Sequence, residues 1–200
     1  MTVELTQDIL HEAGIGNFFR PSQLEPLGIP YHRLRQLVAD DTVERISWGL
    51  YRLTEAELTE RYSMASVCAR VPNAIVCLLS ALQVHEIGTQ IPRQVWIAIP
   101  HKAKAPALTG MGVRLVRFSA AALTYGIQTT SFEEVPTRIT SPARTIVDCF
   151  RFQRLVGREA AVEALREALD DRKVTIAELM RTLEVLPSRR LSAIMETGVL

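Results

Sequence analysis

Residues 21–53 read PSQLEPLGIPYHRLRQLVADDTVERISWGLYRL, and this stretch decides the fold of the first part of the chain. A short helix is expected to stop at Gly28, because glycine readily adopts the left-handed conformation that ends a helix. Pro30 suits the start of a second helix, since its fixed φ matches the first helical position. The apolar side chains of this second helix repeat at helical spacing and predict one buried stripe: Leu34, Leu37 and Val38.

A hairpin is predicted directly after this second helix, over Val43–Leu53, with its turn at Trp48-Gly49. Val, Ile and Tyr in its arms are typical of strands. The order helix, turn, helix, hairpin is that of a winged helix-turn-helix, and the helical spacing of Leu5, Ile9 and Leu10 supplies a further core helix. We therefore expect an N-terminal winged helix-turn-helix DNA-binding domain over residues 1–55.

The second helix is the expected DNA-reading element, because a helix in the major groove contacts base edges with its N-terminal residues. Arginine can bind guanine, and glutamine can bind adenine, through paired hydrogen bonds. The expected DNA contacts from both helices and the hairpin are Ser22, Tyr31, His32, Arg33, Arg35, Gln36, Arg45, Ser47, Trp48 and Arg52. Alternatively, these are solvated residues of an ordinary packed helix. For Trp48 we expect packing against the neighbouring domain rather than insertion into DNA.

The remainder, residues 56–200, is expected to form a mixed α/β domain with a small sheet and several helices, which makes the whole chain α+β. The predicted strands, of which the first is apolar on both faces and therefore buried, are Val95–Ile99, Val113–Phe118, Ile127–Phe132 and Pro136–Thr140. Ser141-Pro142 is an N-cap followed by an N1 proline and opens a helix. Further helices are expected over Arg158–Asp171, Thr175–Leu186 and Ser188–Thr197.

Composition predicts a globular protein of the cytoplasm. The 200 residues carry a net charge of +1, and the N-terminus shows no basic segment followed by an apolar one. The chain also has no run of about 18 apolar residues, so we expect no membrane association. The cysteines, Cys68, Cys77 and Cys149, are odd in number and lack C-x-x-C spacing, which favours buried, reduced thiols over a zinc site.

The chain resembles the AbiEi family of antitoxins from type IV toxin–antitoxin systems. The residues that carry the resemblance are Leu37-Val38, Val43-x-Arg45-Ile46-x-x-Gly49-Leu50-Tyr51, Leu79-Ser80-Ala81-Leu82-x-x-His85, Gln90-x-Pro92-x-x-Val95-x-Ile97 and Ser141-Pro142-Ala143-Arg144-Thr145-Ile146-Val147-Asp148-Cys149. Two features depart from the family pattern. Trp48 stands at the hairpin tip, where the family tends to have a basic residue or proline, and the segment after Gly157 matches only loosely.

This resemblance implies a repressor of its own operon that binds inverted repeats in double-stranded promoter DNA through the winged helix. It also implies a second domain that counters a nucleotidyltransferase-like toxin without forming a stable complex with it. A winged-helix regulator that senses a ligand or partner through its second domain, with no toxin, remains an alternative. The neighbouring gene distinguishes these two possibilities.

An enzyme is the less favoured alternative, specifically a metal-dependent enzyme acting on nucleic acid. Metal-dependent phosphoryl transfer needs clustered carboxylates, yet residues 87–132 contain no Asp or Glu. His85 and Asp148 are isolated in sequence, and we expect both to have structural roles. The sequence therefore predicts neither catalysis nor a cofactor or metal.

Charge is distributed unevenly along the chain. Residues 1–53 hold five arginines against seven acidic residues, a net charge of −2, whereas residues 87–158 carry a net charge of +7. These charges predict a basic face on the second domain that attracts DNA or RNA, with Arg144 and Arg151 on one side of a helix. Its expected members are Lys102, Lys104, Arg114, Arg117, Arg144, Arg151 and Arg154. Alternatively, this surface is simply solvated and neutralised by the acidic helix that follows it.

Overall fold

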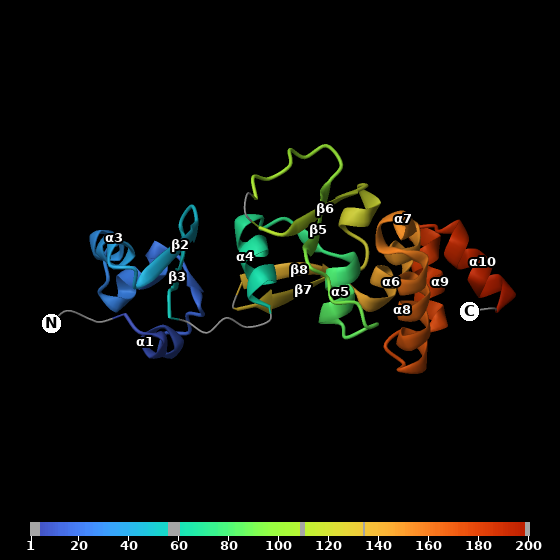
Figure 1. Ribbon diagram of the computed structural model, residues 1–200, viewed down its shortest axis with the longest axis horizontal. Helices are drawn as coiled ribbons and strands as arrows, with labels where there is room; N and C mark the ends of the chain where they lie inside the picture. The colour runs from blue at the N-terminus through green and yellow to red at the C-terminus, as the bar shows by residue number, and fades with distance from the viewer. Residues whose placement is uncertain (1–4, 56–60, 109–110, 134, 199–200) are drawn as a thin grey trace. The chain divides into compact units, whose positions relative to one another are not determined.

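The computed structural model describes residues 5–55, 61–108, 111–133 and 135–198 (Figure 1), and the side chain of Ser47 lies outside that description. The chain divides into two compact units. The first comprises Met1–Pro72 with Ser131–Thr137, and the second comprises Asn73–Thr130 with Arg138–Leu200. The domain boundary predicted between residues 55 and 56 falls at the edge of residues 56–60, which are outside the described residues.

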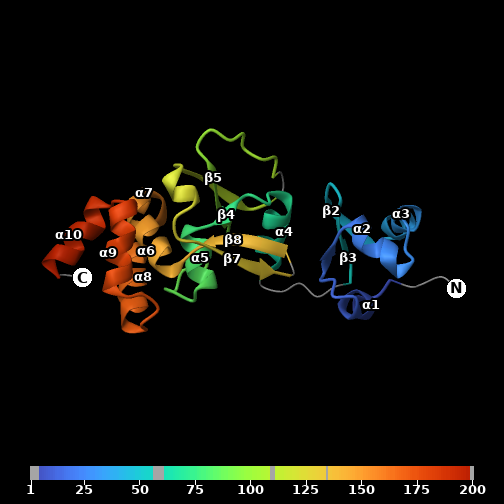
Figure 2. The same cartoon turned by 180° about the vertical axis from the view of Figure 1, so that it is seen from behind.

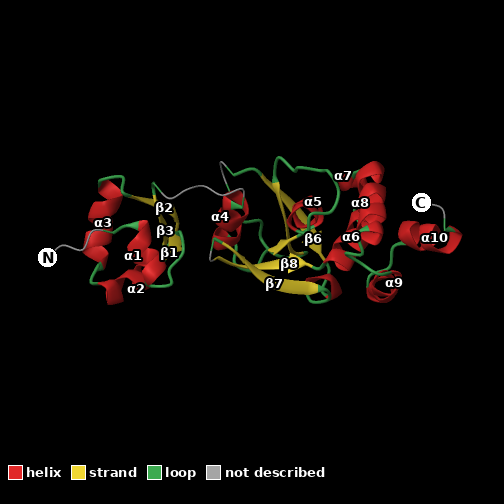
Figure 3. Ribbon diagram, turned by 90° about the horizontal axis from the view of Figure 1, so that it is seen from below, coloured by secondary structure: helices red, strands yellow, loops and turns green. Residues whose placement is uncertain are grey.

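The first unit contains helices and a small antiparallel sheet. Its elements are α1 (Gln7–Glu12), β1 (Phe18–Phe19), α2 (Pro21–Leu24), the 3-10 helix η1 (Glu25–Leu27), α3 (Tyr31–Ala39), β2 (Val43–Ser47), β3 (Leu50–Leu53) and α4 (Tyr62–Arg70). The strand order is β1-β3-β2, and α1, α2 and α3 lie together on one side of this sheet (Figure 3). The two predicted helices and the hairpin are therefore present, whereas β1 was not predicted as a strand.

Local sequence explains the boundaries of these elements. The Thr6 side chain caps α1 by accepting a hydrogen bond from the backbone N–H of Ile9 at 3.4 Å. Gly28 ends η1 with a left-handed φ of 74°, a conformation that costs a glycine little. Pro30 is the N-cap of α3 rather than its first helical residue. The core of this unit is built from side chains of α1, β1, α2, α3 and β3, including Leu10, Phe19, Leu24, Leu34 and Tyr51.

The second unit combines a five-stranded sheet with helices. Its elements are β4 (Ile75–Val76), α5 (Leu78–Val84), β5 (Val95–Pro100), β6 (Val113–Phe118), the 3-10 helix η2 (Ala121–Leu123), β7 (Ile127–Phe132), β8 (Val135–Thr140), α6 (Pro142–Arg151), α7 (Gln153–Val156), α8 (Arg158–Asp170), α9 (Ile176–Val185) and α10 (Arg189–Thr197). The end of β7 and the start of β8, within Ser131–Thr137, are assigned to the first unit. The strand order is β6-β5-β4-β8-β7, with β4 antiparallel to β5 but parallel to β8. Helices α6 to α10 gather at one side of this sheet (Figures 1 and 2).

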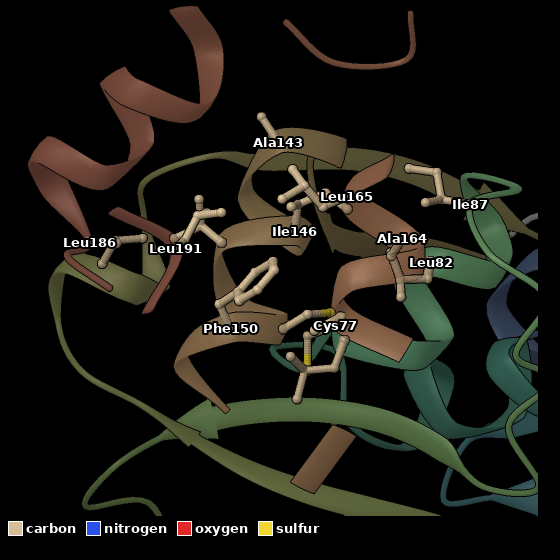
Figure 4. Packing of buried hydrophobic residues seen from close by; sticks show 14 of the residues in the cluster. Cys77, Leu82, Ile87, Ala143, Ile146, Phe150, Ala164, Leu165, Leu186 and Leu191 are labelled. Atoms are coloured by element: carbon tan, nitrogen blue, oxygen red, sulfur yellow. The ribbon is translucent and has the colours of Figure 1, made fainter. Parts of the chain in front are cut away.

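The core of the second unit is centred on α6, whose residues from Ala143 to Phe150 are all buried. Ile146 and Phe150 lie among Leu165 of α8 and Leu191 of α10 (Figure 4). The predicted strands and most helix boundaries agree with these elements within two residues. Ser141 does stand at the N-cap of α6, but its side chain makes no capping hydrogen bond.

The three cysteines are free and buried, as the sequence predicts. Burial raises the pKa of the Cys68 thiol to about 11, and it also raises the pKa of Cys77 and Cys149. All three therefore stay protonated at neutral pH and act as small apolar groups in the core. Among the described residues, no helix is both long enough and apolar enough to cross a membrane.

Candidate nucleic-acid interface

Helix α3 is anchored by one buried stripe and leaves its other side open. Leu34 and Leu37 are buried in the core of the first unit. His32, Arg35 and Gln36 are exposed, and helical periodicity places them on the side opposite this stripe. The exposed side of α3 therefore presents an imidazole, a guanidinium and an amide, which can all donate hydrogen bonds to base edges or phosphates.

Arg33 has a different environment from these three residues. It is half-buried and lines a pocket of about 510 Å³ together with Leu37, Asp40, Asp41 and other residues of the first unit. Its Nη1 donates a hydrogen bond to Oε1 of Gln36 at 3.0 Å, and its Nε is buried without a hydrogen-bond partner in the described part of the chain. Arg33 thus lies at the edge of the apolar stripe, in a pocket that Asp40 and Asp41 also line, and not on the outermost face of α3.

Tyr31, the first residue of α3, connects the helix with the sheet. Its side chain is 53% exposed. Burial raises the pKa of Tyr51 in β3, and a hydrogen bond with Tyr31 raises it further. Tyr31 therefore lies within reach of Tyr51, between the start of α3 and β3.

The hairpin turn carries an exposed aromatic side chain. Trp48 is 89% exposed, and the guanidinium carbon of Arg45 lies 5.2 Å from the centroid of its ring. Trp48 is therefore exposed at the hairpin turn, and its expected packing against the neighbouring domain stays a prediction. Within the hairpin, the cation–π contact with Arg45 supports the indole. The predicted contact from Ser47 concerns a side chain outside the described structure.

The expected DNA contact from Arg52 is wrong, because this arginine is buried in the first unit. Its Nε lies 3.1 Å from the Glu44 carboxylate, to which it donates a hydrogen bond, and its Nη2 donates to the backbone oxygen of Thr54. The guanidinium also lies over the ring of Tyr62, 5.0 Å from its centroid. Arg52 and Glu44 are opposite each other in the paired strands β3 and β2, so the sheet register itself brings the charges together.

Two exposed side chains stand at the start of α2. Ser22 is exposed, as a DNA contact requires. Sequence reasoning omitted Arg20, the exposed N-cap residue of α2, whose backbone N–H donates to Oε1 of Gln23 at 2.8 Å. The signal that could have identified it is its place directly before Pro21, because residues at a helix start are well placed to contact phosphates.

The predicted basic face of the second unit required Arg144 to be exposed, and this arginine is completely buried. Its Nε donates to Oδ2 of Asp148 at 2.8 Å, and its two Nη atoms donate to the backbone oxygens of Tyr125 and Ala122. Gly126 allows this approach, because a Cβ built on it would lie 2.9 Å from Cβ of Arg144. The expectation fails because the polar side of α6 is covered by other segments and does not face solvent.

Arg151 shares the carboxylate of Asp148 with Arg144. Its Nη1 donates to Oδ1 of Asp148 at 2.6 Å, and its side chain is 22% exposed. Burial raises the pKa of the Asp148 carboxyl, although both guanidiniums act in the opposite direction. Burial also lowers the pKa of Arg144. Arg144, Asp148 and Arg151 therefore form a structural triad held by hydrogen bonds. This agrees with the structural role that the sequence predicted for Asp148.

The remaining members of the predicted basic face lie on different elements. Lys102, Lys104, Arg114 and Arg154 are exposed, the first three around β5 and β6 and the last on α7. Arg117 is half-buried, and its Nη1 donates to the backbone oxygens of Pro100, His101 and Ala103. Arg117 therefore holds the turn after β5 in place, and the exposed charges around it are those of Lys102, Lys104 and Arg114.

His85 has the structural role that we expected. It is the C-cap of α5, and its Nε2 donates a hydrogen bond to the backbone oxygen of Thr140 at 2.7 Å. Burial lowers the pKa of this imidazole. Within the described ranges, no cluster of three or more His, Cys, Asp or Glu side chains could hold a metal ion.

Comparison with known proteins gives a fold and, for part of the chain, a family. No curated protein matches the chain. The crystal structure of RV2827C protein from Mycobacterium tuberculosis is similar, with a TM-score of 0.56 over 89% of this chain and 70% of that chain, at 15% sequence identity. At that identity the likeness concerns the fold alone. Residues 7–54, which contain α1 to β3, match the family model described as "Transcriptional regulator, AbiEi antitoxin", and this match confirms the resemblance for the N-terminal segment.

Proposed function

We propose that this protein is an antitoxin of a type IV toxin–antitoxin system and a repressor of its own operon. Residues 5–55 act as a winged helix-turn-helix that binds inverted repeats in double-stranded promoter DNA. The second unit counters a nucleotidyltransferase-like toxin without forming a stable complex with it. The observation that carries the proposal is the match of residues 7–54 to a family of transcriptional regulators, together with the exposed polar side of α3 in that same segment.

DNA recognition is assigned to α3 and the hairpin. His32, Arg35 and Gln36 face outward on a helix whose opposite side is fixed in the core, so they can enter a major groove without disturbing the fold. At the turn of the hairpin, Arg45 and Trp48 contact the sugar-phosphate backbone, a role that the exposure of both side chains supports. Arg20 and Ser22 at the start of α2 add backbone contacts.

Charge predicts the character of this binding. The first 53 residues carry a net charge of −2, and the ion pair with Glu44 already neutralises Arg52. Non-specific affinity for DNA comes mainly from phosphate neutralisation, so it should be weak and salt-sensitive. Discrimination should then rest on base contacts from α3, and an operator of inverted repeats requires two copies of the chain on one site.

The test is an electrophoretic mobility shift with the protein's own promoter DNA. The variant His32→Ala/Arg35→Ala/Gln36→Ala removes the exposed side of α3 and should abolish the specific shift at physiological salt. The matched control, Asp8→Ala/His11→Ala/Glu12→Ala, changes three exposed residues of α1 and should shift the promoter like the unchanged protein. A folded α3 variant that shifts this promoter normally contradicts the assignment.

The antitoxin activity is tested separately by co-expression with the neighbouring gene. Because the α3 variant leaves the second unit intact, it should lose repression but retain rescue from toxicity. If the neighbouring gene is not toxic in the absence of this protein, the protein is a regulator without a toxin. Co-purification of a stable complex with the toxin would contradict the proposed mode of neutralisation.

A further inference from the structure

A basic pocket lies in the second unit, where the end of α6 meets the start of α10. It has a volume of about 620 Å³, and its lining includes Arg151, Phe152, Ser188, Arg189 and Arg190. None of the residues that line it is acidic. Arg189 and Arg190 are exposed, and neither forms an ion pair within the part of the chain that the structure describes.

The pocket contains the N-terminus of α10, a helix of nine residues. The first backbone N–H groups of a helix have no partner inside the helix, and the helix dipole makes this end attractive to anions. Acidic residues in the first turn often offset the positive charge of a helix N-terminus. The first turn of α10 contains none and instead carries Arg189 and Arg190. The local field at this end of α10 is therefore strongly positive.

Ser188 adds an uncharged hydrogen-bonding group to the lining of the pocket. It is the N-cap of α10 and only 6% exposed, yet its hydroxyl makes no capping bond to the first turn. Among the described residues, this hydroxyl has no other hydrogen-bond partner. Serine is favoured at an N-cap because its oxygen accepts from the helix, whereas the Ser188 oxygen is not among the buried side-chain atoms that lack a partner and is therefore open to solvent. Because Ser188 lines the pocket and caps nothing, its hydroxyl is available to hydrogen-bond a ligand there.

Arg151 completes the site from the opposite side. Its Nη1 is fixed by Asp148 at 2.6 Å, and its guanidinium carbon lies 5.8 Å from the centroid of the Phe152 ring. Held in this way, the guanidinium loses little conformational freedom when its remaining N–H groups bind an anion. Asp148 is shared by Arg144 and Arg151, so these three groups together keep a net charge of +1.

We infer that this pocket binds the phosphate chain of a small oligophosphate, of which a nucleoside triphosphate is the matching class. Three guanidiniums, the N-terminus of α10 and the Ser188 hydroxyl provide donors for several phosphate oxygens. A volume of about 620 Å³ accommodates more than one phosphate group. This inference concerns the second unit alone and does not rest on DNA binding by the first.

The test is isothermal titration calorimetry on the full chain with ATP, inorganic tripolyphosphate and orthophosphate as probes. ATP and tripolyphosphate should bind, and orthophosphate should bind at least tenfold more weakly. Loss of charge-assisted hydrogen bonds in Arg189→Ala/Arg190→Ala should weaken binding by about tenfold or more. Ser188→Ala, which removes no capping bond, should weaken it by about fivefold.

A matched control separates a site from general electrostatic attraction. Arg166→Ala/Arg172→Ala removes two exposed arginines outside the pocket and should leave the affinity for tripolyphosphate unchanged. Equal affinity for ATP and tripolyphosphate assigns the contacts to the phosphate chain, and tighter binding of ATP adds contacts with the nucleoside. The inference is overturned if no probe binds at millimolar concentration, if orthophosphate binds as tightly as tripolyphosphate, or if the control weakens binding as much as the pocket variants.

Discussion

Helices α3 and α6 have similar sequence patterns but opposite environments. Each has an apolar stripe with arginines off that stripe, and we expected those arginines to face solvent in both helices. In α3 only Leu34 and Leu37 are buried, whereas in α6 every residue from Ala143 to Phe150 is buried. An apolar stripe therefore shows which side of a helix packs first, but it does not show whether the other side is exposed.

The difference arises from what packs against each helix. Helix α6 packs against α5, α8, α9 and α10, so little of its circumference reaches water. A charged side chain on such a helix must find internal partners, because burying an unpaired charge costs several kcal/mol, about 3–5 in mutational studies. Arg144 finds them in Asp148 and in the backbone oxygens of Tyr125 and Ala122.

The largest expected effect follows from this burial. Arg144→Ala should lower the free energy of unfolding by about 3–5 kcal/mol, because it leaves the Asp148 carboxylate buried with one partner fewer. Arg154→Ala on α7 removes an exposed arginine and should change that free energy by less than about 0.5 kcal/mol. Urea unfolding of both variants measures the difference. If both variants change the free energy of unfolding by the same small amount, then Arg144 behaves like an exposed arginine and the proposed difference between α6 and α3 is wrong.

The second prediction concerns two arginines of α3 itself. Arg35 is exposed on the outer side, whereas Arg33 is half-buried and bound to Gln36. Arg35→Ala should therefore weaken operator binding by about 1–3 kcal/mol and relax specificity at one base pair. Arg33→Ala should weaken it less. Mobility shifts with operators changed at single base pairs measure both effects, and a larger loss from Arg33→Ala would assign base reading to the edge of the stripe.

Much of the fold was predictable because it depends on neighbours in sequence. Gly28, Gly49 and the pair Ser141-Pro142 mark a helix end, a hairpin turn and a helix start by their own conformational preferences. The exposed side of α3 followed from the spacing of Leu34 and Leu37. These features need no knowledge of what lies elsewhere in the chain.

The errors concern side chains whose partners are distant in sequence. Arg144 is separated by about twenty residues from the two carbonyls that bind it, and Arg52 is covered by Tyr62 of another element. Periodicity contains no information on such contacts. One available signal was the i, i+4 spacing of Arg144 and Asp148, which is typical of an ion pair on one helix side. The pocket at Ser188 also required the structure, since its other side comes from the end of α6.

The third prediction concerns Arg52, whose contribution to stability should lie between that of the buried Arg144 and that of the exposed Arg154. Its side chain is 8% exposed, but that of its partner Glu44 is 53% exposed, so water can solvate the carboxylate if the arginine is removed. Arg52→Ala should therefore lower the free energy of unfolding by about 1–2 kcal/mol, less than Arg144→Ala. Glu44→Ala is the matched control and should cost less again. A loss from Arg52→Ala as large as that from Arg144→Ala would show that the exposure of the partner is not decisive.

The smallest expected effect is a pH dependence at the end of β8, where His85 donates to the backbone oxygen of Thr140. Burial lowers the pKa of His85 below the ordinary histidine value of about 6.5, so at pH values between the folded-state and ordinary pKa the unfolded chain binds more protons than the folded chain. The stabilisation from neutral His85 is therefore complete above about pH 6.5 and is lost as the pH falls through the folded-state pKa. His85→Gln keeps a side-chain N–H donor but cannot titrate. Urea unfolding from pH 7 to pH 5 should show a smaller loss of stability in this variant than in the unchanged protein, whereas parallel losses would assign the pH dependence to other groups.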